Sequence, residues 1–202
     1  MFCRSAILVA IAVADLAFSA TIEIVAQAAY DKPDPLEFAP NEIIAAVGDV
    51  LEFHFAGPGT GVLGSNHSVA QGDFENPCNP APNGFFSGYM AVNATSTEAD
   101  MVFRVPVTST DPMVFYCTQG THCTRGMHGV VNGADDQTLQ SYRRSITVNR
   151  NAVAPNTTGG GEMVPNNISR ILPAETPGAA CSAKASLVLI LVGLGLALLI
   201  AQ

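Results

Sequence analysis

The sequence predicts an all-β sandwich followed by a disordered stalk, and three observations lead to this expectation. Between residues 21 and 150, short runs rich in Val, Ile and Phe are separated by Gly, Pro, Asn or Asp. Segments 50–55 and 100–105 mix alternation with apolar runs, as sandwich strands facing a core do. Beyond residue 150 the alternation stops, and Pro, Gly, Thr and Asn dominate.

The predicted strands fill a single domain over residues 21–150, which is the size of one sandwich. They cover residues 21–26, 42–46, 50–55, 66–71, 100–107, 113–117 and 129–132. One short helix is predicted over 134–144, because acids occupy its first turn and arginines its last, which suits the helix dipole. Residues 151–180 are predicted to be a flexible stalk.

The first twenty residues are typical of a secretory signal peptide. Arg4 gives a basic start, residues 6–13 form an apolar run, and small residues precede a cleavage site after Ala20. A buried first helix is the alternative. A signal peptide would make the protein secreted.

The C-terminal segment 181–202 is predicted to be a GPI-attachment signal or a membrane tail. Its apolar run, residues 187–201, is short for a spanning helix, which needs about 20 residues, and no basic residue follows it. Small residues and a polar spacer precede the run, as in GPI signals, whose tail is replaced by a lipid. We expect attachment at Gly178, with Ala179 and Ala180 as neighbouring options. The predicted location is therefore the cell surface, on the plasma membrane or the cell wall.

The charge of the chain is acidic, with 9 Lys and Arg against 17 Asp and Glu, a net charge of −8. Such a surface repels nucleic acids and anionic membranes, so no nucleic-acid partner is expected. The charge is spread along the chain, which favours solubility over a dedicated cationic partner. We expect a monomer.

Glycosylation sequons occur at Asn93, Asn156 and Asn167, and glycans there would suit a cell-surface stalk. A fourth sequon begins at Asn66. Because this one overlaps the metal site described next, we do not expect it to carry a glycan.

Cysteine parity indicates one unpaired thiol. Cys3 leaves with the signal and Cys181 with the tail, so that Cys78, Cys117 and Cys123 remain. In an oxidising compartment two of the three should pair. The third is either a metal thiolate or a spare buried cysteine, and parity alone does not say which one it is.

Four residues offer a soft metal site. Cys117, His122 and Met127 follow the spacing Cys-x4-His-x4-Met at the end of a strand, and His67 lies in a strand of its own. A thiolate favours Cu(I), imidazoles suit both oxidation states, and a weak axial thioether completes the set. This mixture is the one that a one-electron copper carrier needs.

These residues give the chain a resemblance to a known family. Residues 21–131 resemble cupredoxins, closest to plant phytocyanins and fungal cell-surface plastocyanin-like proteins. The matching motifs are Cys117-x4-His122-Cys123-x3-Met127, His67-Ser-Val, the segments 38–41 and 46–49, and Gln71-x2-Phe74-x2-Pro77-Cys78. The resemblance implies a Greek-key sandwich and one type 1 copper ion on His67, Cys117, His122 and Met127. It also implies a disulfide between Cys78 and Cys123, which would pin the ligand loop.

Several alternatives remain at the site. Zinc could use Cys117, His122 and Cys123 with a second histidine, although adjacent ligands suit a tetrahedral site poorly. Met127 could serve only as core packing. Ser68, directly after His67, is expected to orient that ligand or to form a hydrogen bond near the thiolate.

Two further histidines are not expected to bind the metal. His54 lies in an apolar strand and is expected to be a hydrogen-bonded sheet residue. His128 follows Met127, and we expect it to face solvent near the copper.

The predicted function is one-electron transfer or copper handling outside the cell, without enzymatic activity. The donor or partner, whether a protein or a small molecule, is not identified by the sequence. A structural or adhesive wall protein that uses the fold as a scaffold is the alternative. A laccase-like oxidase is less expected because the four histidines form no His-x-His pair, and a monooxygenase with an N-terminal histidine would need His in place of Thr21.

Overall fold

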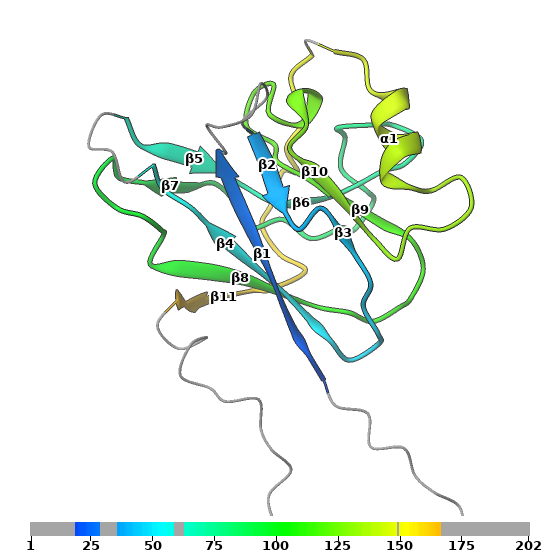
Figure 1. Cartoon of the computed structure of the whole chain (residues 1–202), viewed down its shortest axis with the longest axis horizontal. Helices are drawn as coiled ribbons and strands as arrows, with labels where there is room; N and C mark the ends of the chain where they lie inside the picture. Colours follow the sequence, from blue (N-terminus) through cyan, green and yellow to red (C-terminus); the bar gives the residue numbers. More distant parts are fainter. Residues whose placement is uncertain (1–18, 29–35, 59–62, 149, 167–202) are drawn as a thin grey trace, which may run out of the picture.

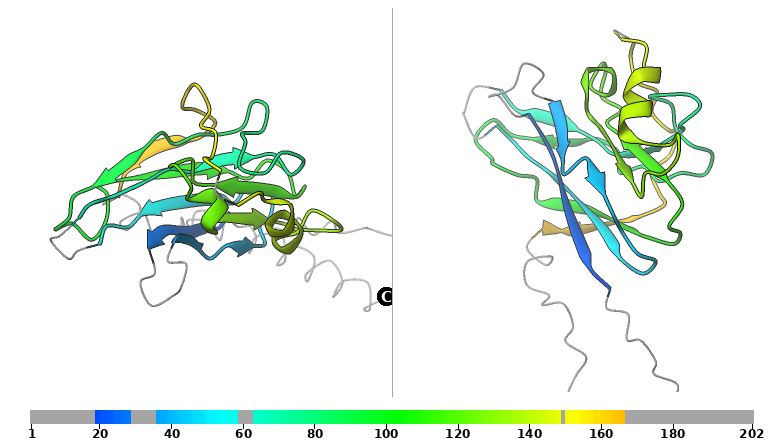
Figure 2. Two further views of the ribbon diagram at one scale, coloured as in Figure 1. Left: turned by 90° about the horizontal axis from the view of Figure 1, so that it is seen from above. Right: turned by 45° about the vertical axis from the view of Figure 1, so that its right-hand side comes forward.

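The structure is a computed structural model that describes residues 19–28, 36–58, 63–148 and 150–166. They form two crossing β-sheets and a small two-stranded sheet, with a short helix at one end (Figures 1 and 2). For this part of the chain, the prediction of an all-β sandwich with one short helix is confirmed. The strands are β1 (Thr21–Ala28), β2 (Leu36–Ala39), β3 (Glu42–Ile43), β4 (Val50–Phe55), β5 (Ser65–His67), β6 (Ala70–Gly72), β7 (Met90–Val92), β8 (Met101–Pro106), β9 (Met113–Tyr116), β10 (His128–Val131) and β11 (Glu162–Pro165).

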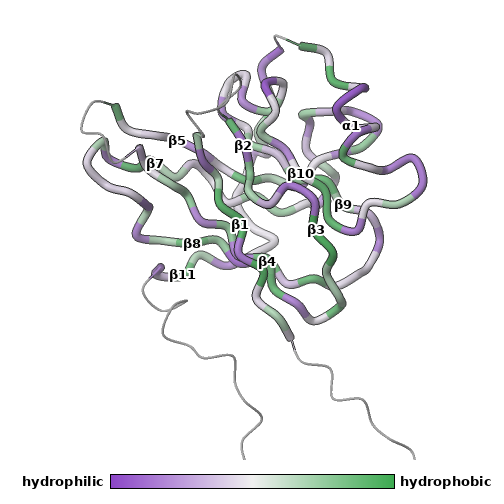
Figure 3. Tube along the Cα trace, in the orientation of Figure 1, coloured by the Kyte–Doolittle hydropathy of each residue, from purple (hydrophilic) through white to green (hydrophobic). Residues whose placement is uncertain are grey.

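The larger sheet has the strand order β11-β8-β4-β1-β2. Its central strand, β4, runs parallel to β1 and antiparallel to β8. Successive side chains of a strand point to opposite faces, so β4 directs Leu51, Phe53 and Phe55 into the core, where each is fully buried. Glu52 and His54 lie on the opposite face. Figure 3 shows hydrophobic positions along β1 and β4 of this sheet.

The smaller sheet, in the order β3-β10-β9-β6, supplies the other wall of the core. Phe115 of β9 packs against Phe38 and Phe53 of the larger sheet, with ring centroids 5.1 and 5.3 Å apart. These edge-to-face contacts join the two layers. Cys117 is the next residue after β9. The packing of Phe115 therefore fixes the position of the main chain from which the Cys117 side chain projects.

The opposite face of β9 is covered by the helix α1 (Leu139–Ser145). Val114 and Tyr116 of β9 form a second buried cluster with Leu139 and Tyr142 of the helix. Apart from these two residues, the helix is mostly hydrophilic (Figure 3). A three-residue 3-10 turn, η1 (Cys123–Arg125), lies beside α1 at the same end of the molecule (Figures 1 and 2).

The predicted start of the helix, at residue 134, is wrong. The helix begins at Leu139, after Thr138, whose hydroxyl accepts the Ser141 N–H at 3.1 Å, while the Thr138 N–H donates to the Ser141 hydroxyl at 2.9 Å. This reciprocal cap satisfies backbone groups that a helix end leaves free. Asp135 has a φ of +51°, in the left-handed region, so the acidic residues belong to a turn that precedes the helix.

The prediction that the domain ends at residue 150 is also wrong, because residues 150–166 belong to the sandwich. Strand β11 pairs with β8, placing Met163 opposite Phe103, and Met163 packs against the core. Upstream of it, Gly159 and Phe86 exchange two backbone hydrogen bonds of 2.8 and 3.0 Å. The part of the predicted stalk that the structure describes therefore packs against the domain: Ala152 and Ala154 lie on the second buried cluster, and β11 forms an edge of the larger sheet.

The strand predicted over 66–71 is two strands. Strand β5 pairs with β7, whereas β6 pairs with β9 of the smaller sheet, so the chain changes sheets at Ser68 and Val69. Strands β2, β7 and β11 were not predicted. The predicted signal peptide up to residue 18, the rest of the predicted stalk, Asn167, Gly178 and the C-terminal apolar run lie outside the described residues. Within the described ranges, no helix has the length and apolar character to cross a bilayer.

Candidate metal centre

Three side chains that are distant in sequence meet at the end of the sandwich where β9 stops. The donor atoms of His67, Cys117 and His122 all lie within 4.8 Å of one another. The Cys117 sulfur is 3.5 Å from Nδ1 of His122, and the two imidazole rings have centroids 5.2 Å apart. His67 and Cys117 are buried, and His122 is half-buried. One sulfur and two nitrogens thus surround a space suited to a single transition-metal ion.

The positions of these donors follow from the sheet connections. His67 is the last residue of β5, and Cys117 directly follows β9. His122 precedes the turn η1, and the loop then returns so that Met127 leads into β10. The Cys117 N–H donates to Met127 O, and the Met127 N–H donates to His122 O, both at 3.0 Å. Main-chain hydrogen bonds therefore close the loop.

Met127 is fully buried and belongs to the core cluster between the sheets. Its main chain is bonded to Cys117 and to His122, as described above. Burial agrees with both readings of this residue, a packing role and an axial thioether, so its role as a ligand stays a prediction.

Ser68 holds the strand of His67 against the strand of Cys117. Its hydroxyl accepts the Thr118 N–H at 3.0 Å, lies 2.8 Å from the Thr118 hydroxyl and is 3.9 Å from the Cys117 sulfur. A second link joins the same segments, because the Asn66 side-chain amide donates to Gln119 at 3.3 Å. Ser68 therefore lies where the sequence predicts, next to the thiol.

The electrostatics favour neutral imidazoles. Burial, with a smaller contribution from His122, lowers the pKa of His67 to about 4. Burial, followed by the charge of Arg125, lowers the pKa of His122. Burial also raises the pKa of the Cys117 thiol. The apolar surroundings thus oppose a bare thiolate, whereas a bound cation would reverse that balance and deprotonate the sulfur.

The hydrogen bonding of His67 tests whether the pocket fits a metal. Both of its ring nitrogens are buried, and neither has a hydrogen-bond partner among the described residues. An unpaired buried polar atom costs about 1–3 kcal/mol. A bound metal would satisfy one of these nitrogens, and the neutral, desolvated ring is in the form that binds metals. The residues therefore fit the predicted ion.

The disulfide joins Cys78 to Cys123, with Cα atoms 5.8 Å apart, as the resemblance implies. Among the described residues, Cys117 is the free cysteine, and it is buried. Because the sulfur of Cys123 is used in the disulfide, the zinc site that would need Cys117, His122 and Cys123 together is wrong.

The two remaining histidines lie outside the cluster. His54 contacts Glu98 through Nδ1 and Glu52 through Nε2, the latter at 2.8 Å, as a hydrogen-bonded sheet residue should. The expectation that His128 faces solvent is wrong: it is 2% exposed, and its Nδ1 lies 3.0 Å from Cys123 O. The helix α1 covers it, with the ring of Tyr142 packed on the imidazole.

Tyr142 was not predicted to belong to the site region. The available signal was the i, i+3 spacing of Leu139 and Tyr142, which marks one buried face of a helix. Among the sequons, Asn93 and Asn156 are exposed, while one side-chain atom of Asn66, Oδ1, is buried.

Comparison with known proteins gives two sequence relatives, both from the fungus Arthroderma benhamiae. A protein described as "Probable GPI-anchored cupredoxin-1" is 33% identical over 156 residues, covering 77% of this chain and 74% of the relative. An "Extracellular serine-rich protein" is 28% identical over 165 residues, covering 81% of this chain, and the chain spans 59% of that relative's length. No family model matches the chain.

Solved structures of similar fold include a purple cupredoxin from Nitrosopumilus maritimus, with 17% identity and a TM-score of 0.38 over 54% of this chain and 95% of that one. Oxidised plastocyanin from Dryopteris crassirhizoma has 12% identity and a TM-score of 0.33, covering 55% of this chain and 97% of the plastocyanin. Both TM-scores are low, so the family assignment depends on the first sequence relative.

Proposed function

Because the chain belongs to the cupredoxin family, we propose that it is an extracellular copper protein which transfers single electrons or handles copper at the cell surface. His67, Cys117, His122 and Met127 would hold one type 1 copper ion. The observation that supports this proposal is the convergence of the first three donors within 4.8 Å.

When bound, copper would supply the exchange between Cu(II) and Cu(I), and the protein's part is to keep the donors still. Cys117 and His67 are buried, the ligand loop is closed by main-chain hydrogen bonds, and Ser68 joins the two strands. Donors held in this way need little rearrangement when the charge changes. Of the three donors, His122 alone is partly exposed to solvent. An electron would therefore enter or leave through its imidazole.

The proposal is tested by adding Cu(II) to the purified metal-free protein and recording optical and EPR spectra. We expect one copper per chain and an intense visible band from sulfur-to-copper charge transfer. Cys117→Ser should remove the band, and Ser109→Ala, a change at an exposed loop, should keep it. A colourless wild-type protein, or colour that persists in Cys117→Ser, would overturn the proposal.

The cell-surface location is the second part of the proposal. It is supported by the names of the two relatives, one GPI-anchored and the other extracellular, and by the small residues around Gly178 in the sequence. Phospholipase C should release the protein from membranes of a eukaryotic host. Retention after confirmed lipase activity, with residues 187–201 found by mass spectrometry, would instead indicate a membrane tail.

A further inference from the structure

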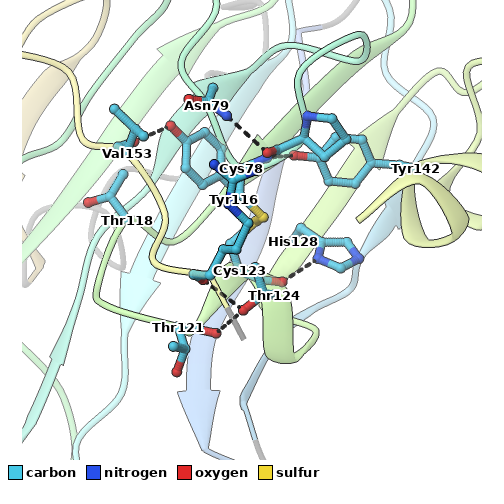
Figure 4. Close-up of a disulfide and its surroundings, with 12 residues drawn as sticks. Cys78, Asn79, Tyr116, Thr118, Thr121, Cys123, Thr124, His128, Tyr142 and Val153 are labelled. Atoms are coloured by element: carbon cyan, nitrogen blue, oxygen red, sulfur yellow. Dashed lines mark hydrogen bonds between the residues drawn. A yellow bond between two sulfur atoms is a disulfide. The ribbon is translucent and has the colours of Figure 1, made fainter. Parts of the chain in front are cut away.

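Behind the ligand loop, four residues form a closed circuit of contacts, which we call the brace: Cys78, Cys123, His128 and Tyr142 (Figure 4). The disulfide joins the first two, and Nδ1 of His128 lies 3.0 Å from Cys123 O. The His128 ring packs edge-on against Tyr142, with centroids 5.2 Å apart. The Tyr142 hydroxyl accepts the Cys78 N–H at 2.7 Å, which completes the circuit.

Tyr142 supports the disulfide from the helix α1. Its side chain is 1% exposed, and its ring also packs edge-on against Phe74 at 5.9 Å. Cys78 has a φ of +61°, a left-handed conformation that non-glycine residues rarely adopt. Its buried N–H finds its acceptor in the Tyr142 hydroxyl, so the tyrosine stabilises an unusual backbone at one end of the disulfide.

His128 holds the main chain at the other end of the disulfide. A carbonyl oxygen only accepts, so Nδ1 must carry the proton and donate to Cys123 O. The disulfide fixes the side chain of Cys123, and His128 fixes its carbonyl group. The residue directly after His122 is therefore held at two points.

The brace also acts on the second end of the ligand turn. His128 directly follows Met127, so a residue held by the brace adjoins each of His122 and Met127. Within the turn, the Met127 N–H donates to His122 O, and the Gly126 N–H donates to Cys123 O. A shift of the brace would move both ligand positions together.

We propose that His128 and Tyr142 are positioning residues which, through the Cys78–Cys123 disulfide, hold the turn that presents His122 and Met127 to the metal. Neither residue belongs to the cluster of His67, Cys117 and His122. The effect on the metal site rests on the proposed copper function, whereas the contacts of the brace do not require a metal.

The first test is hydrogen exchange of the metal-free full chain. Tyr142→Phe keeps the ring but leaves the Cys78 N–H without an acceptor, and His128→Phe keeps a ring against Tyr142 but removes the donor to Cys123. Each should speed exchange of the amides of residues 121–127 on the order of tenfold, because the turn then opens locally. Double-mutant analysis should show that the two effects do not add.

The matched control is Val102→Ala. Val102 is a fully buried residue of β8 in the larger sheet, so its truncation should lower the free energy of unfolding without touching the brace. It should leave exchange in residues 121–127 unchanged. If Val102→Ala speeds this exchange as much as the brace variants do, or if neither brace variant speeds it, the brace does not hold the turn and the proposal fails.

The second test uses the copper-loaded chain. Tyr142→Phe should keep the thiolate band while shifting its position, the EPR hyperfine splitting and the reduction potential, and Val102→Ala should shift none of them. Faster exchange with unchanged spectrum and potential would overturn the positioning role. A wild-type protein without the thiolate band would overturn the proposed copper function, and the exchange measurement would still decide whether the brace holds the turn.

Discussion

The Ser68 hydroxyl lies 3.9 Å from the Cys117 sulfur while accepting the Thr118 N–H at 3.0 Å. Ser68 is fully buried, so this single side chain both satisfies a buried backbone donor and lies against the thiol. It connects the strand of one ligand, His67, to the strand of another.

Ser68→Ala should therefore lower the free energy of unfolding by about 1–3 kcal/mol, because the Thr118 N–H loses its acceptor. In the copper-loaded protein it should also lower the reduction potential, since a hydrogen bond near the sulfur weakens its donation to Cu(II). Urea unfolding and voltammetry measure the two effects. In Ser109→Ala the lost hydroxyl accepts the Asp111 N–H at the exposed surface, where water can replace it, so this variant should lower stability less and leave the potential unchanged. An unchanged potential in Ser68→Ala would show that the hydroxyl does not act on the sulfur.

Substitutions at Met127 separate an axial ligand from a packing residue. Met127→Gln offers a harder oxygen donor that favours Cu(II), so the potential should fall while copper stays bound. Met127→Leu removes the donor and should raise the potential. His122→Ala should instead weaken copper binding, because it removes an equatorial ligand. If both Met127 variants keep the wild-type potential and spectrum in voltammetry and optical titration, Met127 only packs the core.

The stability of the metal-free protein should fall as the solution is acidified from pH 7 to pH 5. Burial lowers the pKa of both His67 and His128 from 6.5 to about 4. Between these values the unfolded chain takes up protons that the folded chain refuses, so unfolding becomes easier as the pH falls, and above pH 6.5 neither ring contributes. The full effect is about 3 kcal/mol per histidine, reached near pH 4.

Urea unfolding at several pH values measures this loss. Comparing pH 7 with pH 5 limits the contribution of carboxylates such as Asp49 and Asp73, whose pKa values are lowered from 3.8 by hydrogen bonds and which act at lower pH. His67→Leu cannot take up a proton and should remove part of the pH dependence. The remainder belongs to His122 and His128, whose pKa values burial also lowers. A slope that is the same in His67→Leu would mean that His67 is not buried in its neutral form.

Substitutions in β11 distinguish a sheet strand from a free stalk. Met163→Ala should lower the free energy of unfolding by about 1–3 kcal/mol, less than for a fully buried methionine, because Met163 is half-buried against the core. Glu162→Ala, at the exposed neighbouring position, should have little effect. Equal unfolding midpoints for the wild type and Met163→Ala would contradict the pairing of β11 with β8.

The sequence by itself determined the fold class and the residue types of the site. Short apolar strands between turn residues predict a sandwich. Cys117, His122 and Met127 lie close together in the sequence, so their spacing, which is typical of copper sites, can be recognised without the fold. The position of Ser68 beside His67 was also readable, because the two residues are adjacent. The pairing of Cys78 with Cys123 came from the resemblance, since cysteine parity left all three pairings open.

The tertiary structure decided which segments pair and which side chains are covered. Strand β11 is four residues long, and its pairing with β8 is a contact across about sixty positions of sequence that no local pattern encodes. The burial of His128 is likewise not encoded locally, because its position after Met127 in the sequence predicts a surface residue. It is buried because α1, formed later in the chain, packs Tyr142 over it. Burial of this kind depends on what other segments contribute, and that is settled only when the chain has folded.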